Sequence, residues 1–137
     1  MDKRNFTEYV IESVRELPPS TIIGREIHLQ RRGIHHMGLC PFHNDRKLGS
    51  FVVTDKKGIF KCFACDEGGD SIKFISSYRG ISYLQSAFDI ALENRIITDD
   101  EYEEYFGRRR YSKKQIKNIE KKYIEKDRKK FVSKKAD

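Results

Sequence analysis

Two short cysteine-rich motifs constrain this chain more than any other feature. They are Cys40-Pro41-Phe42-His43 and Cys62-Phe63-Ala64-Cys65, and eighteen residues separate them. Each motif places two metal ligands on one tight turn, and the intervening segment is long enough for two strands that bring the turns together. Three cysteines and one histidine form a common closed ligand set for Zn²⁺, with metal–sulfur distances of about 2.3 Å. We therefore predict one structural zinc ion bound by Cys40, His43, Cys62 and Cys65.

Other readings of the cysteines fit less well. All three cysteines of the chain lie within one 26-residue window, in two pairs, which unrelated buried cysteines and an incidental histidine would not explain. An iron–sulfur cluster usually takes four thiolates, and a redox site usually has one CxxC motif beside a βαβ unit. Three cysteines also cannot form a complete disulfide set. A zinc site remains the favoured interpretation.

The composition agrees with a small domain that needs help to fold. The chain has 137 residues, of which 37% are hydrophobic, and this content is low for a self-sufficient core. A structural zinc ion would offset the shortage, since its apparent binding free energy of about 10–16 kcal/mol is also folding free energy. With 36% charged residues, no long apolar run and no signal peptide, we expect a soluble, reduced, cytoplasmic protein without membrane contact.

The net charge of +7 is concentrated at the C-terminal end. Residues 1–107 hold 14 Lys and Arg against 17 Asp and Glu, a net charge of −3, whereas residues 108–137 hold 14 against 4, a net charge of +10. The basic tail has three open interpretations: a solvated, partly frayed helix or linker, a basic arm that follows a phosphate backbone, or a helix that docks on a protein partner.

Periodicity, capping motifs and turn residues predict an α+β fold, a zinc-ribbon-like antiparallel sheet flanked by helices and followed by a C-terminal helical extension. We expect an N-terminal helix capped by Asn5 and a short second helix capped by Ser20 or Thr21. Gly68-Gly69 is expected to break the chain. The remaining expected elements are a hairpin over 28–39, strands over 50–54 and 59–63 around a turn at 55–58, and helices over 71–79, 83–92, 99–107 and 113–130. The expected caps of these four helices are Asp70 or Ser71, Ser82, Thr98 and Ser112, and Gly80 and Gly107 are expected to end the first and the third. The expected division is an N-terminal helix (1–19), a zinc-binding domain (20–97) and an acidic, then basic, helical tail (98–137).

Alternation along the second strand separates its side chains. Phe60 and Cys62 fall on one face, and Ile59, Lys61 and Phe63 on the other. If Cys62 faces the metal, Lys61 points away from it, beside aromatic neighbours.

Four segments together resemble the N-terminal zinc-binding domain of bacterial DnaG-type DNA primases. They are Gly38-Leu39-Cys40-Pro41-Phe42-His43-Asn44-Asp45, Ser50-Phe51-Val52-Val53, Phe60-Lys61-Cys62-Phe63-Ala64-Cys65 and Gly68-Gly69-Asp70-Ser71-Ile72-Lys73-Phe74-Ile75. The segment from Gly80 to Ala87 also fits the family's next helix. The resemblance covers about Ile22 to Ile96, a little over half of the chain.

The resemblance implies a zinc-ribbon fold with the four named ligands. It also implies a sheet face that binds single-stranded template DNA and helps a primase to choose a start site. The chain departs from the family pattern at 29–34, where two basic positions are lost and Arg31 is kept, and at 46–51, which is one residue longer and lacks a proline. After Ile96 no Toprim-type polymerase pattern follows, and the acidic residues at 99–104 look like a solvated helix face. We therefore expect no primer synthesis by this chain alone.

Two functional hypotheses follow. In the first, the chain is a zinc-stabilised single-stranded DNA-binding module of a primase-type replication system, working beside a separate primase polymerase domain or helicase. Phosphates would contact basic side chains, and bases would stack on an exposed ring, each stack being worth about 1–3 kcal/mol. The candidates are Arg31, Arg32, Arg46, Lys47 and Lys61 for phosphates, and Phe51 and Phe63 for bases. Core packing of the rings and a solvated role for the basic residues are the alternatives.

The second hypothesis is a protein-interaction adaptor. The zinc domain would then be a rigid platform, and the tail would dock on a helicase, polymerase or relaxase of a plasmid, phage or mobile element. Salt-sensitive binding to oligonucleotides distinguishes the first hypothesis from the second. An enzyme acting alone is the weakest reading.

Overall fold

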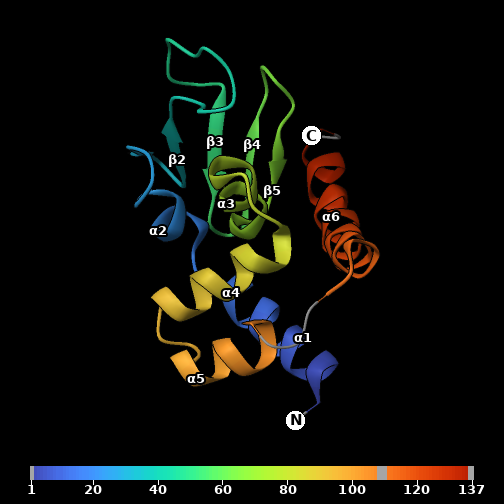
Figure 1. Cartoon of the computed structure of the whole chain (residues 1–137). Helices are drawn as coiled ribbons and strands as arrows, with labels where there is room; N and C mark the ends of the chain where they lie inside the picture. Colours follow the sequence, from blue (N-terminus) through green and yellow to red (C-terminus); the bar gives the residue numbers. More distant parts are fainter. Residues whose placement is uncertain (1, 108–110, 136–137) are drawn as a thin grey trace.

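The computed structural model describes residues 2–107 and 111–135, and it forms a sheet with helices packed around it (Figure 1). The helices are α1 (Lys3–Arg15), α2 (Pro19–Ile23), α3 (Ser71–Arg79), α4 (Tyr83–Glu93), α5 (Asp99–Tyr102), the π-helical turn η1 (Glu103–Gly107) and α6 (Lys113–Lys135). The strands are β1 (Gln30–Arg32), β2 (His35–Gly38), β3 (Phe51–Thr54), β4 (Ile59–Cys62) and β5 (Gly68–Gly69).

The strands form one antiparallel sheet in the order β1-β2-β3-β4-β5. The predicted hairpin and the predicted strand pair are both present, which confirms the expected α+β fold. The expectation for Gly68-Gly69 was incomplete, because these residues pair with Lys61 and Phe60 of β4 and add a fifth strand. Gly69 lies at φ 148°, and a Cβ there would come within 2.9 Å of the Lys73 side chain. Any other residue at this position would therefore have a strained backbone and would clash with Lys73.

The first two helices begin earlier than the sequence predicted. The side chain of Asp2, not Asn5, caps α1, and it accepts a hydrogen bond from the backbone N–H of Asn5 at 2.8 Å. Helix α2 begins at Pro19, where the fixed φ of proline suits the first helical turn. The predicted caps Ser20 and Thr21 therefore lie inside α2.

The later helix ends follow the sequence. The side chains of Asp70, Ser82 and Thr98 cap α3, α4 and α5. Gly80 ends α3 in the left-handed conformation at φ 68°. Because a cap depends on contacts within one turn, it can be read from neighbouring residues.

Phe74 of α3 joins the sheet to the helices. Its ring centroid lies 5.4 Å from that of Phe42, 5.9 Å from Phe51, 5.5 Å from Phe60 and 5.5 Å from Tyr78. Phe51, Phe60 and Phe74 are fully buried. The core therefore runs without interruption from the metal-binding end of the sheet to α3, and α4 and α1 continue it.

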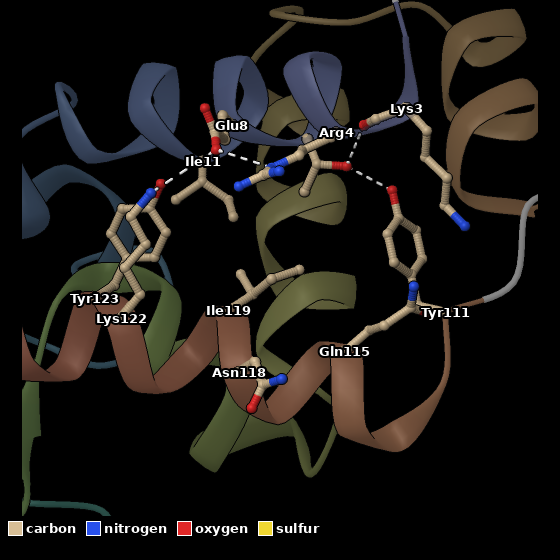
Figure 2. A pocket seen from close by; sticks show the side chains of 11 residues that line it. Lys3, Arg4, Glu8, Ile11, Tyr111, Gln115, Asn118, Ile119, Lys122 and Tyr123 are labelled. Carbon is tan, nitrogen blue, oxygen red and sulfur yellow. Dashed lines mark hydrogen bonds and ion pairs between the residues drawn. The ribbon is translucent and has the colours of Figure 1, made fainter.

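From Lys113 to Lys135 the basic tail is a packed helix rather than a frayed linker, and residues 108–110 and 136–137 of this tail lie outside the described residues. In α6, Tyr123 and Asp127 are only 1% and 2% exposed. Figure 2 shows α6 facing α1 across a pocket of about 490 Å³, with Ile119 and Tyr123 opposite Ile11. Arg15 of α1 holds Asp127 at 2.9 Å and Asp70 at 2.6 Å. None of the three interpretations of the tail anticipated that it packs on its own domain.

No helix within the described ranges is both long enough and apolar enough to cross a membrane.

Candidate metal centre

The four predicted ligands converge at one end of the sheet. Cys40 follows β2, His43 lies in the next turn, Cys62 ends β4, and Cys65 lies in the turn before β5. Their candidate ligand atoms all lie within 4.8 Å of one another. Two turns that are distant in sequence thus present their donors to one point, as the motif spacing predicted.

The spacing of the donor atoms fits a tetrahedral zinc ion. A tetrahedron with metal–sulfur bonds of about 2.3 Å has sulfur–sulfur edges of about 3.8 Å and nitrogen–sulfur edges of about 3.6 Å. The Sγ atoms of Cys40 and Cys65 lie 3.7 Å apart, and Nε2 of His43 lies 3.3 Å from Sγ of Cys62. The three cysteines are free thiols, so the convergence is not a disulfide. The donor set and its dimensions match a structural zinc site.

Hydrogen bonds within each turn hold the ligands in place. The backbone N–H of Cys40 donates to the carboxylate of Asp45 at 2.9 Å, and that of Phe42 approaches Sγ of Cys40 at 3.4 Å. In the second turn, Cys62 donates its N–H to the carbonyl of Glu67 at 2.8 Å, and Asp66 donates to the carbonyl of Cys62 at 2.9 Å. Short-range hydrogen bonds therefore close both turns.

Burial and hydrogen bonding give the thiols different acidities. Burial raises the pKa of Cys40 to about 12. Burial also acts to raise the pKa of Cys62, but hydrogen bonds from the backbone N–H groups of Cys65 and Ala64 and from the His43 ring lower it to about 7. A zinc ion held by these four residues would stabilise the thiolates directly and would tie the two turns together.

Phe51 and Phe63, the two candidate stacking rings, have opposite environments. Phe51 is fully buried between Phe60 and Phe74, so the expectation that it could stack on a base was wrong. Phe63 is 53% exposed and lies directly after the ligand Cys62. The register explains the difference, because Phe51 pairs with Cys62 and shares its inward face, whereas Phe63 is the next residue along and points outward.

Lys61 lies on the outer face of the sheet, as alternation predicted, but it is less available than expected. Its side chain is 13% exposed, and its Nζ contacts the Asp66 carboxylate at 2.5 Å and the Asp66 carbonyl at 3.2 Å. Asp66 has a positive φ of 67°, and its carboxylate accepts from Lys61 across the turn. No pattern in the sequence indicated this ion pair, although a positive φ is more common at Asp and Asn than at most residues.

The remaining basic candidates are exposed but are not all on one face. Arg31 and Arg32 lie in β1, and Arg46 and Lys47 lie in the loop between His43 and β3. Arg32 pairs with His35, whereas Lys61 pairs with Val52, which in turn pairs with Met37. Because His35 and Met37 are two residues apart in β2, Arg32 and Lys61 lie on the same, outer face of the sheet. Arg31 points to the opposite face, and its Nε donates to the carbonyl of Gly33 at 3.3 Å.

Comparison with known proteins gives a consistent family match. The CHC2 zinc finger family, the zinc ribbon of DnaG, matches residues 6–105. A DNA primase of Clostridium acetobutylicum is 33% identical over 118 residues, which is 84% of this chain and 20% of the primase. DNA primases of Aquifex aeolicus and Rickettsia prowazekii are each 43% identical, over 56% and 53% of this chain and 15% and 12% of theirs. The chain therefore spans a fifth or less of the length of these relatives.

A solved structure shares the fold. It is the crystal structure of the Aquifex aeolicus primase with its zinc-binding and RNA polymerase domains. The TM-score is 0.56 at 38% sequence identity, and the alignment covers 67% of this chain and 24% of the primase chain.

Proposed function

Because the chain belongs to the CHC2 zinc finger family, the zinc-binding domain of DnaG-type primases, we propose that it binds a single DNA strand on the outer face of its sheet. In this role it helps a primase polymerase domain to engage its template. Phe63 carries the proposal, since it is a half-exposed ring held between two zinc ligands. The backbone of Phe63 is held in the turn by the hydrogen bond from its N–H to the carbonyl of Ser50, so only side-chain freedom is lost when a base stacks on the ring.

Basic side chains near Phe63 suit a phosphate backbone. Lys61 lies two residues before Phe63 on the outer face, and Arg46 and Lys47 are exposed on the loop that joins one zinc turn to β3. Arg32 shares the outer face but lies in β1, toward the opposite end of the sheet. Residues 1–107 have a net charge of −3, so any attraction to DNA in this part of the chain comes from local groups rather than from total charge.

The test is the affinity for a labelled single-stranded oligonucleotide. Phe63→Ala should weaken binding by about 1–3 kcal/mol, roughly 5- to 150-fold, with an unchanged melting temperature. Tyr9→Ala is the matched control, because Tyr9 is a 47% exposed ring on α1, away from the zinc turns. Equal affinities for wild type and Phe63→Ala would remove this ring from the interface.

The Lys61–Asp66 pair gives a second, opposite test. If Lys61 binds phosphate, Asp66 competes for it, so Asp66→Asn should release the ammonium while tolerating the positive φ. The affinity should rise, and the rise should disappear in the Lys61→Ala background. A fall in affinity for Asp66→Asn would contradict a phosphate role for Lys61.

A groove beside the zinc turns favours the adaptor hypothesis as a second candidate. Leu39 and Leu48 are 47% and 43% exposed, and with Ile27, His28 and Arg46 they line a groove of about 580 Å³. Exposed leucines around a groove are typical of protein contacts. If the chain does not bind oligonucleotides even at low salt, where binding to DNA is strongest, the result would favour this adaptor role over DNA binding.

A further inference from the structure

A second basic surface is formed where α6 meets the turn between β3 and β4. Lys56 and Lys57 of the turn and Lys129 and Lys130 of α6 line a groove of about 390 Å³. Only the turn lies within residues 6–105, which match the zinc finger family. The groove therefore depends on a helix that follows the family domain. It will be called the four-lysine groove.

Specific contacts hold the two sides of the groove together. Nζ of Lys130 donates to the backbone carbonyl of Lys57 at 2.7 Å. It also lies 3.1 Å from the carboxylate of Asp127, which is anchored by Arg15. This end of α6 is therefore tied to both the sheet and α1, and the lysines are brought together by packing rather than by chance proximity.

The positive charge of the groove is poorly neutralised. Among the described residues, no acidic side chain forms an ion pair with Lys56, Lys57 or Lys129, and Asp127 is shared between Lys130 and Arg15. The carboxylate of Asp55, next in the turn, accepts hydrogen bonds from the N–H and hydroxyl of Ser20 at 2.9 and 2.6 Å and lies 3.9 Å from Nδ1 of His36, so it is directed toward these groups and forms no ion pair with a groove lysine. Like charges repel when they are brought together, and an anionic ligand would relieve this repulsion.

The position of the groove indicates which anion it takes. The β3–β4 turn lies at one end of β4, and Phe63 follows the other end. Lys57 lies five positions before Cys62, which corresponds to about 17 Å along an extended strand. A nucleic acid strand that stacks on Phe63 needs to span only this separation to reach the groove.

From these observations we propose that the four-lysine groove binds the phosphate backbone of the same DNA strand that contacts Phe63. The groove thereby extends the binding surface beyond the family domain. This inference rests on the proposed function, since it takes DNA as the ligand. The basic tail then contributes to binding through one end of α6, which the fold positions against the sheet.

The experiment compares two double variants with equal charge. Lys56→Ala with Lys129→Ala removes two exposed groove lysines. Lys113→Ala with Lys114→Ala removes two exposed lysines at the other end of α6. Binding to a single-stranded oligonucleotide is measured between about 50 and 200 mM salt. The slope of log K against log salt is negative, and each lost phosphate contact reduces its magnitude by about 0.7. The slope of the groove variant should therefore be smaller in magnitude by about 1.4.

Several-fold weaker binding and the smaller slope should appear in the groove variant alone, at the wild-type melting temperature. Equal effects of the two double variants would overturn the inference, because only total charge would then matter. So would a groove variant that keeps full DNA affinity but loses binding to polyglutamate, which would identify an acidic protein segment as the ligand. Wild-type protein that does not bind DNA would instead refute the proposed function itself.

Discussion

The metal-binding end of the sheet and the helical layer are ordered by different means. Around the zinc turns, side chains such as Phe63, Leu39 and Leu48 are substantially exposed, and four ligands hold the two turns together. In the helical layer, Ile11 of α1 and Leu84 and Phe88 of α4 are fully buried, and these two helices pack against each other. One end of this small domain therefore adds a metal ion to its buried rings, whereas the other relies on buried apolar surface alone.

Zinc removal should have the largest effect and should fall on one end first. The ion contributes about 10–16 kcal/mol of apparent binding free energy, so chelation should lower the melting temperature strongly. Backbone amides of β3 and β4 should lose protection from hydrogen exchange before those of α1 and α4. Cys62→Ser in the presence of zinc should reproduce the result. An apo form with an unchanged melt would show that the two regions do not differ in this way.

Arg15→Ala should have the next largest effect, and it should affect the helical side. The charged side chain joins α1 to Asp70 and to Asp127 on α6. Burial acts to lower the pKa of Arg15, but the hydrogen bond and charge of Asp127 and the charge of Asp70 raise it above its ordinary value. Removing the guanidinium leaves buried Asp70 without its cation and leaves buried Asp127 with Lys130 alone, and it should cost about 3–5 kcal/mol of the unfolding free energy.

Denaturant unfolding would measure this loss. Arg4→Ala is the control. The Arg4 side chain is 90% exposed, and its ion pair with Glu8 is long, at 3.9 Å. Such a surface ion pair contributes about 0–1 kcal/mol to stability. Zinc affinity should change less than stability in Arg15→Ala if the two ends are separate. A parallel loss of zinc affinity would show instead that Asp70, which precedes α3, couples them.

Gly80→Ala should have the smallest effect. Gly80 lies at φ 68°, and a Cβ added there would meet no atom within 4 Å, so the cost is conformational only, about 1–2 kcal/mol. Gly80→Asn should cost less, since asparagine tolerates the left-handed region. Thermal melts of both variants would measure the difference, and an alanine variant as stable as wild type would show that the end of α3 relaxes without strain.

The helix caps and the ligand set were accessible from sequence for a common reason. Asp70, Ser82 and Thr98 act within three residues of themselves, and each metal motif needs only one turn. The early start of α1 was missed because Asp2 and Asn5 are both good caps. In the structure the Asp2 side chain takes this role and accepts a hydrogen bond from the backbone N–H of Asn5.

The amino-acid sequence alone was enough to predict the four ligands, the antiparallel strands and most helix ends, because these depend on neighbouring residues. Packing in three dimensions was needed to establish that Phe51 is buried while Phe63 is exposed, and that Lys61 is held by Asp66. Packing also placed α6 against α1 through Arg15 and Asp127, which are 112 residues apart. Contacts at such separations leave no periodic trace in the sequence, since they depend on how whole elements pack.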